Sequence, residues 1–205
     1  MAATGEPLVE FLAMMRQMRR GCAWKRSQTH HSLARFLLEE TYETLEAIEV
    51  GEAGGGWDHL REELGDLLLQ VYFHAVIAEE AGEFTLDEVV GDLAEKMVRR
   101  NPHVFGGVDA GDDVETIEAA WQAAKAAEKQ RSGVTDGIPP TLPALLYAAK
   151  VLRRLDRAGE APATPPAGTD PDALGERLLA LVAEANASDL DPEQELRAAV
   201  RRRLP

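Results

Sequence analysis

Five acidic residues in two groups point to metal-dependent chemistry. The first group is Glu39, Glu40 and Glu43 in the stretch EETYE, and the second is Glu63 and Asp66 in ELGD. Side chains three or four positions apart on a helix are neighbours, with Cβ atoms about 5–6 Å apart. If the two helices pack antiparallel, four carboxylates converge and repel one another unless a cation neutralises them. Mg²⁺ prefers oxygen ligands and often bridges to substrate phosphates. We therefore expect Glu40, Glu43, Glu63 and Asp66 to hold Mg²⁺, with Mn²⁺ as a substitute.

The hydrophobic pattern predicts that both acidic helices are packed against protein. The first helix, about residues 32–50, has an apolar face made by Leu33, Leu37, Thr41, Leu45 and Ile48. The second, about residues 58–80, is hydrophobic nearly all round after its acids, which is typical of a buried helix. Its polar exceptions Glu63, Asp66, Gln70 and His74 lie on one line. That line faces either a site or a subunit interface. Taken alone, each acid pair is ordinary solvated surface and His74 is an interior histidine.

Composition and charge restrict the partners. The chain has 205 residues and a net charge of −14, which argues against a broad surface for nucleic acids or membranes, since both are polyanions. One cysteine excludes an intrachain disulfide and a thiolate metal cluster. The first residues lack the pattern of a signal peptide, and the longest apolar run, residues 67–78, is too short to span a bilayer. These features predict a cytoplasmic protein.

The acidic motifs and their surroundings resemble the MazG-like nucleoside triphosphate pyrophosphohydrolases of the all-α NTP pyrophosphatase superfamily. EExxE is followed by nineteen residues and then ExxD. The stretches GCAWKRSQTHHSL, REELGDLLLQV, EKMVRRNPHVFG, W-x-x-x-K and IPPTLPALLYAAKV also look like that family, so the resemblance covers about residues 8–155. One departure is that Ala23 and Lys25 flank Trp24, where the family usually has Pro and Asp.

The resemblance implies hydrolysis of a nucleoside triphosphate to the monophosphate and pyrophosphate, with a house-cleaning role for non-canonical or excess nucleotides. It implies that Lys96, Arg99 and Arg100 contact the substrate phosphates, although cations at a helix end also suit its dipole. It further implies nucleotide contacts for Trp121 and for Lys125, one turn later; on spacing alone Trp121 is a core residue.

Two residues have roles that the motifs leave open. Glu39 lies beside the acid cluster, so we assign it as the base for the attacking water. Trp24 either stacks on the base or fills the core as an anchor of its loop.

Helix boundaries can be predicted elsewhere from short signals. Residues 22–30 read as a loop, and GEAGGG reads as a flexible turn. Thr85 and Glu88 form a capping box pattern at the start of another helix. Asn101-Pro102 ends that helix, and Asp112 or Asp113 caps the next.

The second half of the chain reads as a faint repeat of the first. We divide the chain into a catalytic helical domain (1–131), a linker (132–143) and a degenerate second repeat (144–205). The second repeat has no EExxE helix, and Ala173 stands in the place of Glu63. A Pro/Ala/Gly-rich stretch, residues 158–172, replaces that helix and is expected to be disordered.

The fold class is therefore all-α, an antiparallel helical bundle of the all-α NTP pyrophosphatase type, and the buried second helix predicts a homo-oligomer, most simply a dimer. Two other kinds of protein could also carry four acids on helices. A di-iron carboxylate bundle requires Glu-x-x-His motifs, which neither acid pair contains. A non-catalytic module that binds nucleotides or metal and regulates a partner is the main alternative to an enzyme.

Overall fold

The computed structural model describes residues 6–106, 113–128, 133–160 and 171–203, and the regular structure of these residues is helical. The all-α prediction is confirmed. The chain divides into two compact units, Met1–Trp121 and Gln122–Pro205. The first unit contains α1 (Pro7–Gly21), α2 (Ala23–Ser27), α3 (His30–Val50), the π-helical turn η1 (Gly51–Gly55), α4 (Asp58–Ala81), α5 (Leu86–Arg100) and α6 (Pro102–Phe105). The division falls inside α7 (Val114–Glu128), and α8 (Ala144–Arg157), α9 (Pro171–Ala187) and α10 (Pro192–Arg201) follow.

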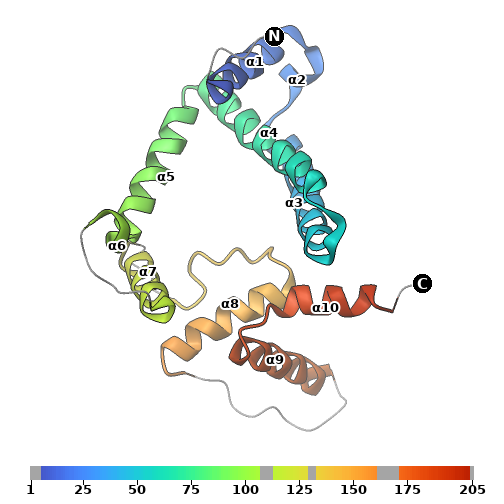
Figure 1. Ribbon diagram of the computed structural model, residues 1–205, viewed down its shortest axis with the longest axis vertical. Helices are drawn as coiled ribbons and strands as arrows, with labels where there is room; N and C mark the ends of the chain where they lie inside the picture. The colour runs from blue at the N-terminus through green and yellow to red at the C-terminus, as the bar shows by residue number, and fades with distance from the viewer. Residues whose placement is uncertain (1–5, 107–112, 129–132, 161–170, 204–205) are drawn as a thin grey trace. The chain divides into compact units, whose positions relative to one another are not determined.

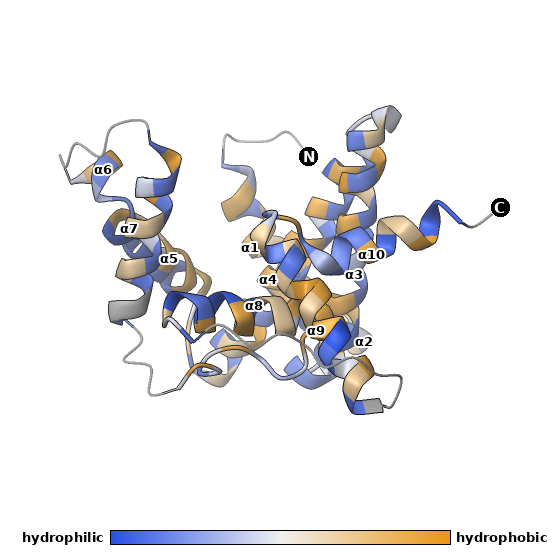
Figure 2. Cartoon of the chain, turned by 90° about the horizontal axis from the view of Figure 1, so that it is seen from below, coloured by the Kyte–Doolittle hydropathy of each residue, from blue (hydrophilic) through white to orange (hydrophobic). Residues whose placement is uncertain are grey.

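The core of the first unit lies between α1, α3 and α4. The two long helices α3 and α4 run antiparallel and side by side, as the acid motifs require (Figure 1). Helix α1 packs against α4, and stretches of hydrophobic residues recur along these helices (Figure 2). The buried core residues are Leu12, Met15, Leu33, Tyr72, Phe73, Ala75, Val76 and Leu86. This packing fixes which sides of α3 and α4 face each other, and so where the acids point.

The turn between α3 and α4 is tightly built. A Cβ atom added to Gly51 would lie 2.5 Å from ring atoms of Trp57, so only glycine allows this indole to pack on the backbone. Gly54 and Gly56 have φ of +89° and +86°, a region that favours glycine. The glycine-rich stretch therefore forms a defined π-helical turn, whereas the sequence predicts only a flexible one.

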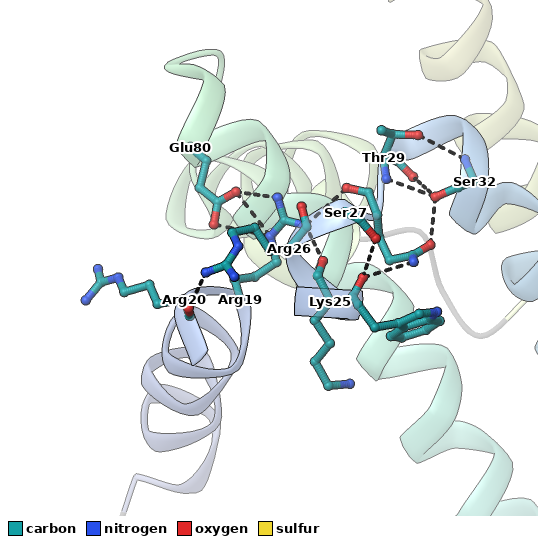
Figure 3. A network of polar contacts seen from close by, with 10 residues as sticks. Arg19, Arg20, Lys25, Arg26, Ser27, Thr29, Ser32 and Glu80 are labelled. Carbon is teal, nitrogen blue, oxygen red and sulfur yellow. Dashed lines mark hydrogen bonds and ion pairs between the residues drawn. The ribbon is translucent and has the colours of Figure 1, made fainter. Parts of the chain in front are cut away.

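The segment after α1 is partly helical, which corrects the prediction of a loop. Five of its residues form α2, and Figure 3 shows the side chain of Arg19 reaching across to it. The buried guanidinium donates to the carbonyls of Lys25, Arg26 and Gln28, and it pairs with Glu80 of α4, with Nε 3.1 Å from Oε2. Arg19 therefore ties α2 to both α1 and α4.

Capping motifs set the helix boundaries. The predicted box at α5 is confirmed: the Glu88 amide donates to Thr85 Oγ1 at 3.2 Å, and the Thr85 amide donates to Glu88 at 2.7 Å. Hydrogen bonds from Thr85 lower the pKa of Glu88. A second box, between Thr29 and Ser32, starts α3 at His30, two residues earlier than predicted.

At α7 the cap is Asp113, whose Oδ2 accepts hydrogen bonds from the Thr116 hydroxyl and, at 3.1 Å, from the Thr116 amide. These two bonds lower the pKa of Asp113. Of the two predicted caps, Asp112 lies outside the described residues.

The second unit has its own small core. Ala149 and Leu152 of α8 pack against Val182 of α9, and the Asn186 side chain donates to the Ala149 carbonyl at 3.1 Å. Most of the segment predicted to be disordered, residues 161–170, lies outside the described residues. None of the described helices is long and apolar enough to cross a membrane.

Candidate functional site

Three of the predicted metal ligands come together between α3 and α4. One carboxylate oxygen from each of Glu40, Glu43 and Glu63 lies within 4.8 Å of the other two. Glu63 is buried, Glu40 is half-buried and Glu43 is exposed, so the cluster is open to solvent on the Glu43 side. Carboxylate oxygens alone suit a hard cation such as Mg²⁺, and the open side leaves room for a ligand to reach it.

Asp66, the fourth predicted ligand, is not among the three carboxylates that lie within 4.8 Å of one another, but its charge acts on Glu40. Burial raises the pKa of Glu40, and the charge of Asp66 raises it further, followed by Glu43 and Glu63. A hydrogen bond between the Glu40 and Glu43 side chains acts in the same direction. Four carboxylates without a cation thus favour binding a proton. A divalent cation would relieve the same repulsion, which is why these residues fit a metal.

One neighbour of the cluster is missed by the sequence reasoning. His59 Nε2 lies 2.8 Å from Glu63 Oε1, and the two residues are four positions apart on α4. The i,i+4 spacing of His59 and Glu63 on one helix is the signal from which this contact could be predicted. This contact fixes the orientation of the buried Glu63 carboxylate.

The polar line of α4 continues beyond the acids. Gln70 is buried, and its Oε1 has no hydrogen-bond partner among the described residues. His74 Nδ1 lies 2.7 Å from His30 Nδ1 with the two rings stacked, while its buried Nε2 has no partner in the same residues. Burial, and then His30, lowers the pKa of His74. The expectation of a satisfied interior histidine therefore holds for one nitrogen of His74 and not for the other.

The two tryptophans predicted to contact the nucleobase, Trp24 and Trp121, differ in exposure. Trp24 of α2 is 53% exposed, which argues against a core anchor, and its ring makes a T-shaped contact with Phe36 with centroids 6.4 Å apart. Trp121 of α7 is half-buried, and the guanidinium of Arg100 lies 5.3 Å from its ring centroid. One face of Trp121 is thus already covered by protein.

The predicted phosphate-binding cations lie in the last turns of α5. Arg100 is 6% exposed, Arg99 is exposed and Lys96 is half-buried. Lys125 lies on α7, one turn after Trp121, and is half-buried. The proposed base, Glu39, is exposed and directly precedes Glu40 on α3. The roles of these residues stay predictions.

Comparisons with known proteins identify the family. The MazG nucleotide pyrophosphohydrolase domain matches residues 28–105. The chain is 36% identical to a Thermotoga maritima protein named nucleoside triphosphate pyrophosphohydrolase/pyrophosphatase MazG. The alignment is 215 positions long and covers 94% of this chain and 81% of that protein. This chain belongs to the MazG family. The resemblance inferred from the motifs is thereby confirmed.

Two other relatives are longer than this chain. A Mycobacterium tuberculosis nucleoside triphosphate pyrophosphohydrolase is 44% identical over 198 residues, which cover 96% of this chain and 55% of that protein. An Escherichia coli protein of the same name is 39% identical over 155 residues, 74% of this chain and 57% of that protein. The chain thus spans little more than half the length of these two relatives.

The matched MazG domain extends from Gln28 to Phe105 and so contains α3, α4 and α5. All four predicted metal ligands and the basic end of α5 lie within it. Trp24 and Trp121 lie outside it, on opposite sides.

Proposed function

We propose that this MazG protein hydrolyses nucleoside triphosphates to nucleoside monophosphates and pyrophosphate in a metal-dependent reaction. The observation that carries the proposal is the carboxylate cluster of Glu40, Glu43 and Glu63, which is open to solvent at Glu43 and whose Glu40 also feels the charge of Asp66. The names of the relatives support the same reaction class.

In this proposal Glu40, Glu43, Glu63 and Asp66 hold Mg²⁺. When bound, this ion neutralises charge on the phosphate oxygens and lowers the pKa of a coordinated water. The exposed carboxylate of Glu39 accepts the proton of the attacking water, and His59 keeps the Glu63 carboxylate in its ligating orientation.

The cations at the end of α5 bind the polyphosphate, because phosphoryl transfer depends on neutralising charge that spreads over the phosphate oxygens. Lys96, Arg99 and Arg100 have this role in the proposal.

A pyrophosphate-release assay tests the proposal. The full chain is incubated with a panel of standard, deoxy and damaged nucleoside triphosphates, with Mg²⁺, with Mn²⁺ and with a chelator. We expect equal amounts of monophosphate and pyrophosphate with either metal, loss of activity with the chelator and in Asp66→Asn, and faster turnover of damaged substrates if the role is house-cleaning. Binding of nucleotides without release of pyrophosphate would instead favour the non-catalytic module.

We also propose that α4 forms a homodimer interface. Leu64, Leu68 and Val71 are spaced as one stripe of α4 and are 51%, 39% and 43% exposed. A contiguous exposed apolar stripe on a long helix is typical of an interaction surface. Light scattering after gel filtration should show a dimer for the wild type and a monomer for Leu68→Lys. Val200→Lys, which changes an apolar residue of α10 that is 50% exposed, should remain dimeric.

A further inference from the structure

Two histidines meet where the beginning of α3 packs on α4, and the proposed reaction uses neither of them. His30 is the first residue of α3, and its Nδ1 lies 2.7 Å from Nδ1 of His74 on α4. Glu40 follows His30 by ten residues, and Asp66 precedes His74 by eight. At 1.5 Å per residue, the pair is therefore about 12–15 Å along the helices from these acids.

The hydrogen bond between the two rings ties the first turn of α3 to α4. The other hydrogen bonds of this turn stay within the segment, because Thr29 and Ser32 cap each other (Figure 3) and Ser32 Oγ donates to Gln28 Oε1 at 2.8 Å. Across the ranges that the structure describes, the bond of His30 is the one hydrogen bond that joins residues 29–32 to α4. The histidine pair is thus the polar contact that holds this exposed turn in place.

The bond exists only while one of the two facing nitrogens has no hydrogen. A neutral imidazole carries a hydrogen on one ring nitrogen and accepts with the other, whereas an imidazolium carries a hydrogen on both. A neutral pair, or a pair with one added proton, can therefore place a single hydrogen between the two Nδ1 atoms. When both rings are charged, each Nδ1 carries a hydrogen, so the bond is lost and the two cations repel.

The surroundings of His74 disfavour its charged form. Its Nε2 is buried without a hydrogen-bond partner in the described part of the chain, and so is Oε1 of Gln70, four positions earlier on α4. A hydrogen on this Nε2 would therefore be buried and unpaired. Burial first, and then the charge of His30, lowers the pKa of His74. The positive end of the α3 dipole lies at His30, which also disfavours a second charge in the pair.

The ionisable residues of the neighbouring turns give the pair no counter-ion. The acids there already have partners, which are Arg16 for Glu79, Arg19 for Glu80 and Thr85 for Glu88. The bases there are Lys25 of α2 and His31 and Arg35 of α3. Within the residues that the structure describes, His30 carries the one charge that acts on the pKa of His74. Nothing among these groups offsets a second positive charge.

We propose that the His30–His74 pair is a pH-sensitive switch that holds the beginning of α3 on α4 and releases it when both rings are charged. The inference does not depend on the proposed function, because neither histidine belongs to the proposed metal or substrate site. Its sign also differs from that of the acid cluster. Acid relieves the repulsion around Glu40 and stabilises the fold, whereas acid charges the histidines and loosens the first turn of α3.

The switch acts below the ordinary pKa of histidine, about 6.5. Above that pH both rings are neutral and the contact has its full stability. Because the pKa of His74 is lowered in the closed pair, opening takes up a proton as the pH falls. The equilibrium constant for opening the turn should then rise by up to about tenfold for each pH unit.

Hydrogen exchange at pH 7.5 and 5.0 tests the proposal. The full chain is measured in a chelator, and the rates are corrected for the pH dependence of intrinsic amide exchange. In the wild type, protection of the amides of residues 31–36 should fall about tenfold or more at pH 5.0.

Three variants show whether this loss comes from the pair. His30→Asn places an amide near the position of Nδ1 that donates or accepts without becoming charged, so the contact should stay and its pH dependence should be lost. His30→Ala removes the contact, so the turn should exchange rapidly at both pH values. His31→Asn changes the next residue, which is also exposed, and should behave as the wild type. Since His30 is exposed, its replacement removes no core packing.

NMR titration of the histidine rings is the second measurement. His74 should titrate below free histidine, and it should titrate at higher pH in His30→Asn, because the charge of His30 is gone. The proposal is overturned if the wild type is protected equally at both pH values, if His30→Asn keeps the full pH dependence, or if His31→Asn abolishes it. A His74 ring that titrates like free histidine would also overturn it.

Discussion

Replacing Glu40 with Gln should stabilise the metal-free protein, although it removes a residue of the proposed site. Glu40 is the acid whose pKa is raised by burial and by the charges of Asp66, Glu43 and Glu63 together. Gln has nearly the same shape and carries no charge. The change therefore removes the repulsion and leaves the packing of α3 against α4 almost as it was.

The magnitude follows from the separation of the carboxylates. The three clustered oxygens lie within 4.8 Å of one another. Two unit charges at that distance repel by about 3.5 kcal/mol at an effective dielectric constant of 20, and by about 0.9 kcal/mol in bulk water. Glu43 is exposed and Glu63 is buried, so the pairs fall between these limits. We expect Glu40→Gln to raise the free energy of unfolding by about 1–3 kcal/mol at pH 8.

The free energy of unfolding that Glu40→Gln gains should increase with pH. A carboxyl group with a raised folded-state pKa binds more protons in the folded state than in the unfolded state, so stability falls as pH rises through this window. Below the ordinary pKa of glutamate, about 4.3, Glu40 is protonated in both states and the variant gains nothing from its neutral side chain. The difference between variant and wild type should therefore grow from pH 4 upward and level off above the raised pKa.

Urea unfolding in a chelator, followed by circular dichroism from pH 4 to 8, measures this difference. The matched control is Glu46→Gln, which removes an exposed acid from the same helix. Adding Mg²⁺ should stabilise the wild type by RT ln(1 + [L]/Kd), about 2.7 kcal/mol at a hundred times Kd, and should stabilise Glu40→Gln less.

Two results would refute this reasoning. If Glu40→Gln lowered the free energy of unfolding at pH 8, the carboxylate would be a structural acid with a favourable partner. If Mg²⁺ stabilised both proteins equally, Glu40 would not be a ligand. Glu63→Gln is a useful comparison, because it also loses the contact with His59 and should therefore gain less stability than Glu40→Gln.

Three further predictions concern other parts of the chain. Arg19→Met should lower the free energy of unfolding by about 2–4 kcal/mol in urea titrations, since it leaves three backbone carbonyls and Glu80 without their donor; an unchanged midpoint would refute the role of Arg19 in holding α2. Arg100→Ala should lower kcat/KM for every nucleoside triphosphate and leave the Kd of Mg²⁺ unchanged, and equal kcat/KM in steady-state assays would exclude Arg100 from the site. The fragment 1–131 should release pyrophosphate, and a folded, dimeric but inactive fragment would show that the second unit completes the site.

Features of the fold can be predicted from the sequence where they depend on residues close together in the chain. The predicted apolar face of α3 is right only in part, because Leu33 is buried whereas Leu37 and Ile48 are each 38% exposed. The meeting of Glu40, Glu43 and Glu63 needs only the helical spacing of the acids and the antiparallel packing of α3 against α4. The capping box at Thr85 needs only backbone groups within its own turn, and it forms as predicted.

Features that depend on distant residues could not be predicted in the same way. Helix α2 is five residues long, too short for a periodic pattern, and its carbonyls are held by Arg19 from another helix. The stacking of His30 on His74 joins residues 44 positions apart, and no local rule brings them together.

Because Trp57 packs on Gly51, the number of residues between the acids of α3 and this turn is fixed. An α-helix advances by 100° per residue, since it has 3.6 residues per turn. One residue inserted between Glu43 and Gly51 would therefore rotate Glu40 and Glu43 by about 100° away from Glu63, or would force Trp57 off the glycine. Insertions at Gly54, where a Cβ would meet nothing within 4 Å, leave both helices in phase. Length variation in this turn should thus be confined to the few residues beyond the contact between the indole and Gly51.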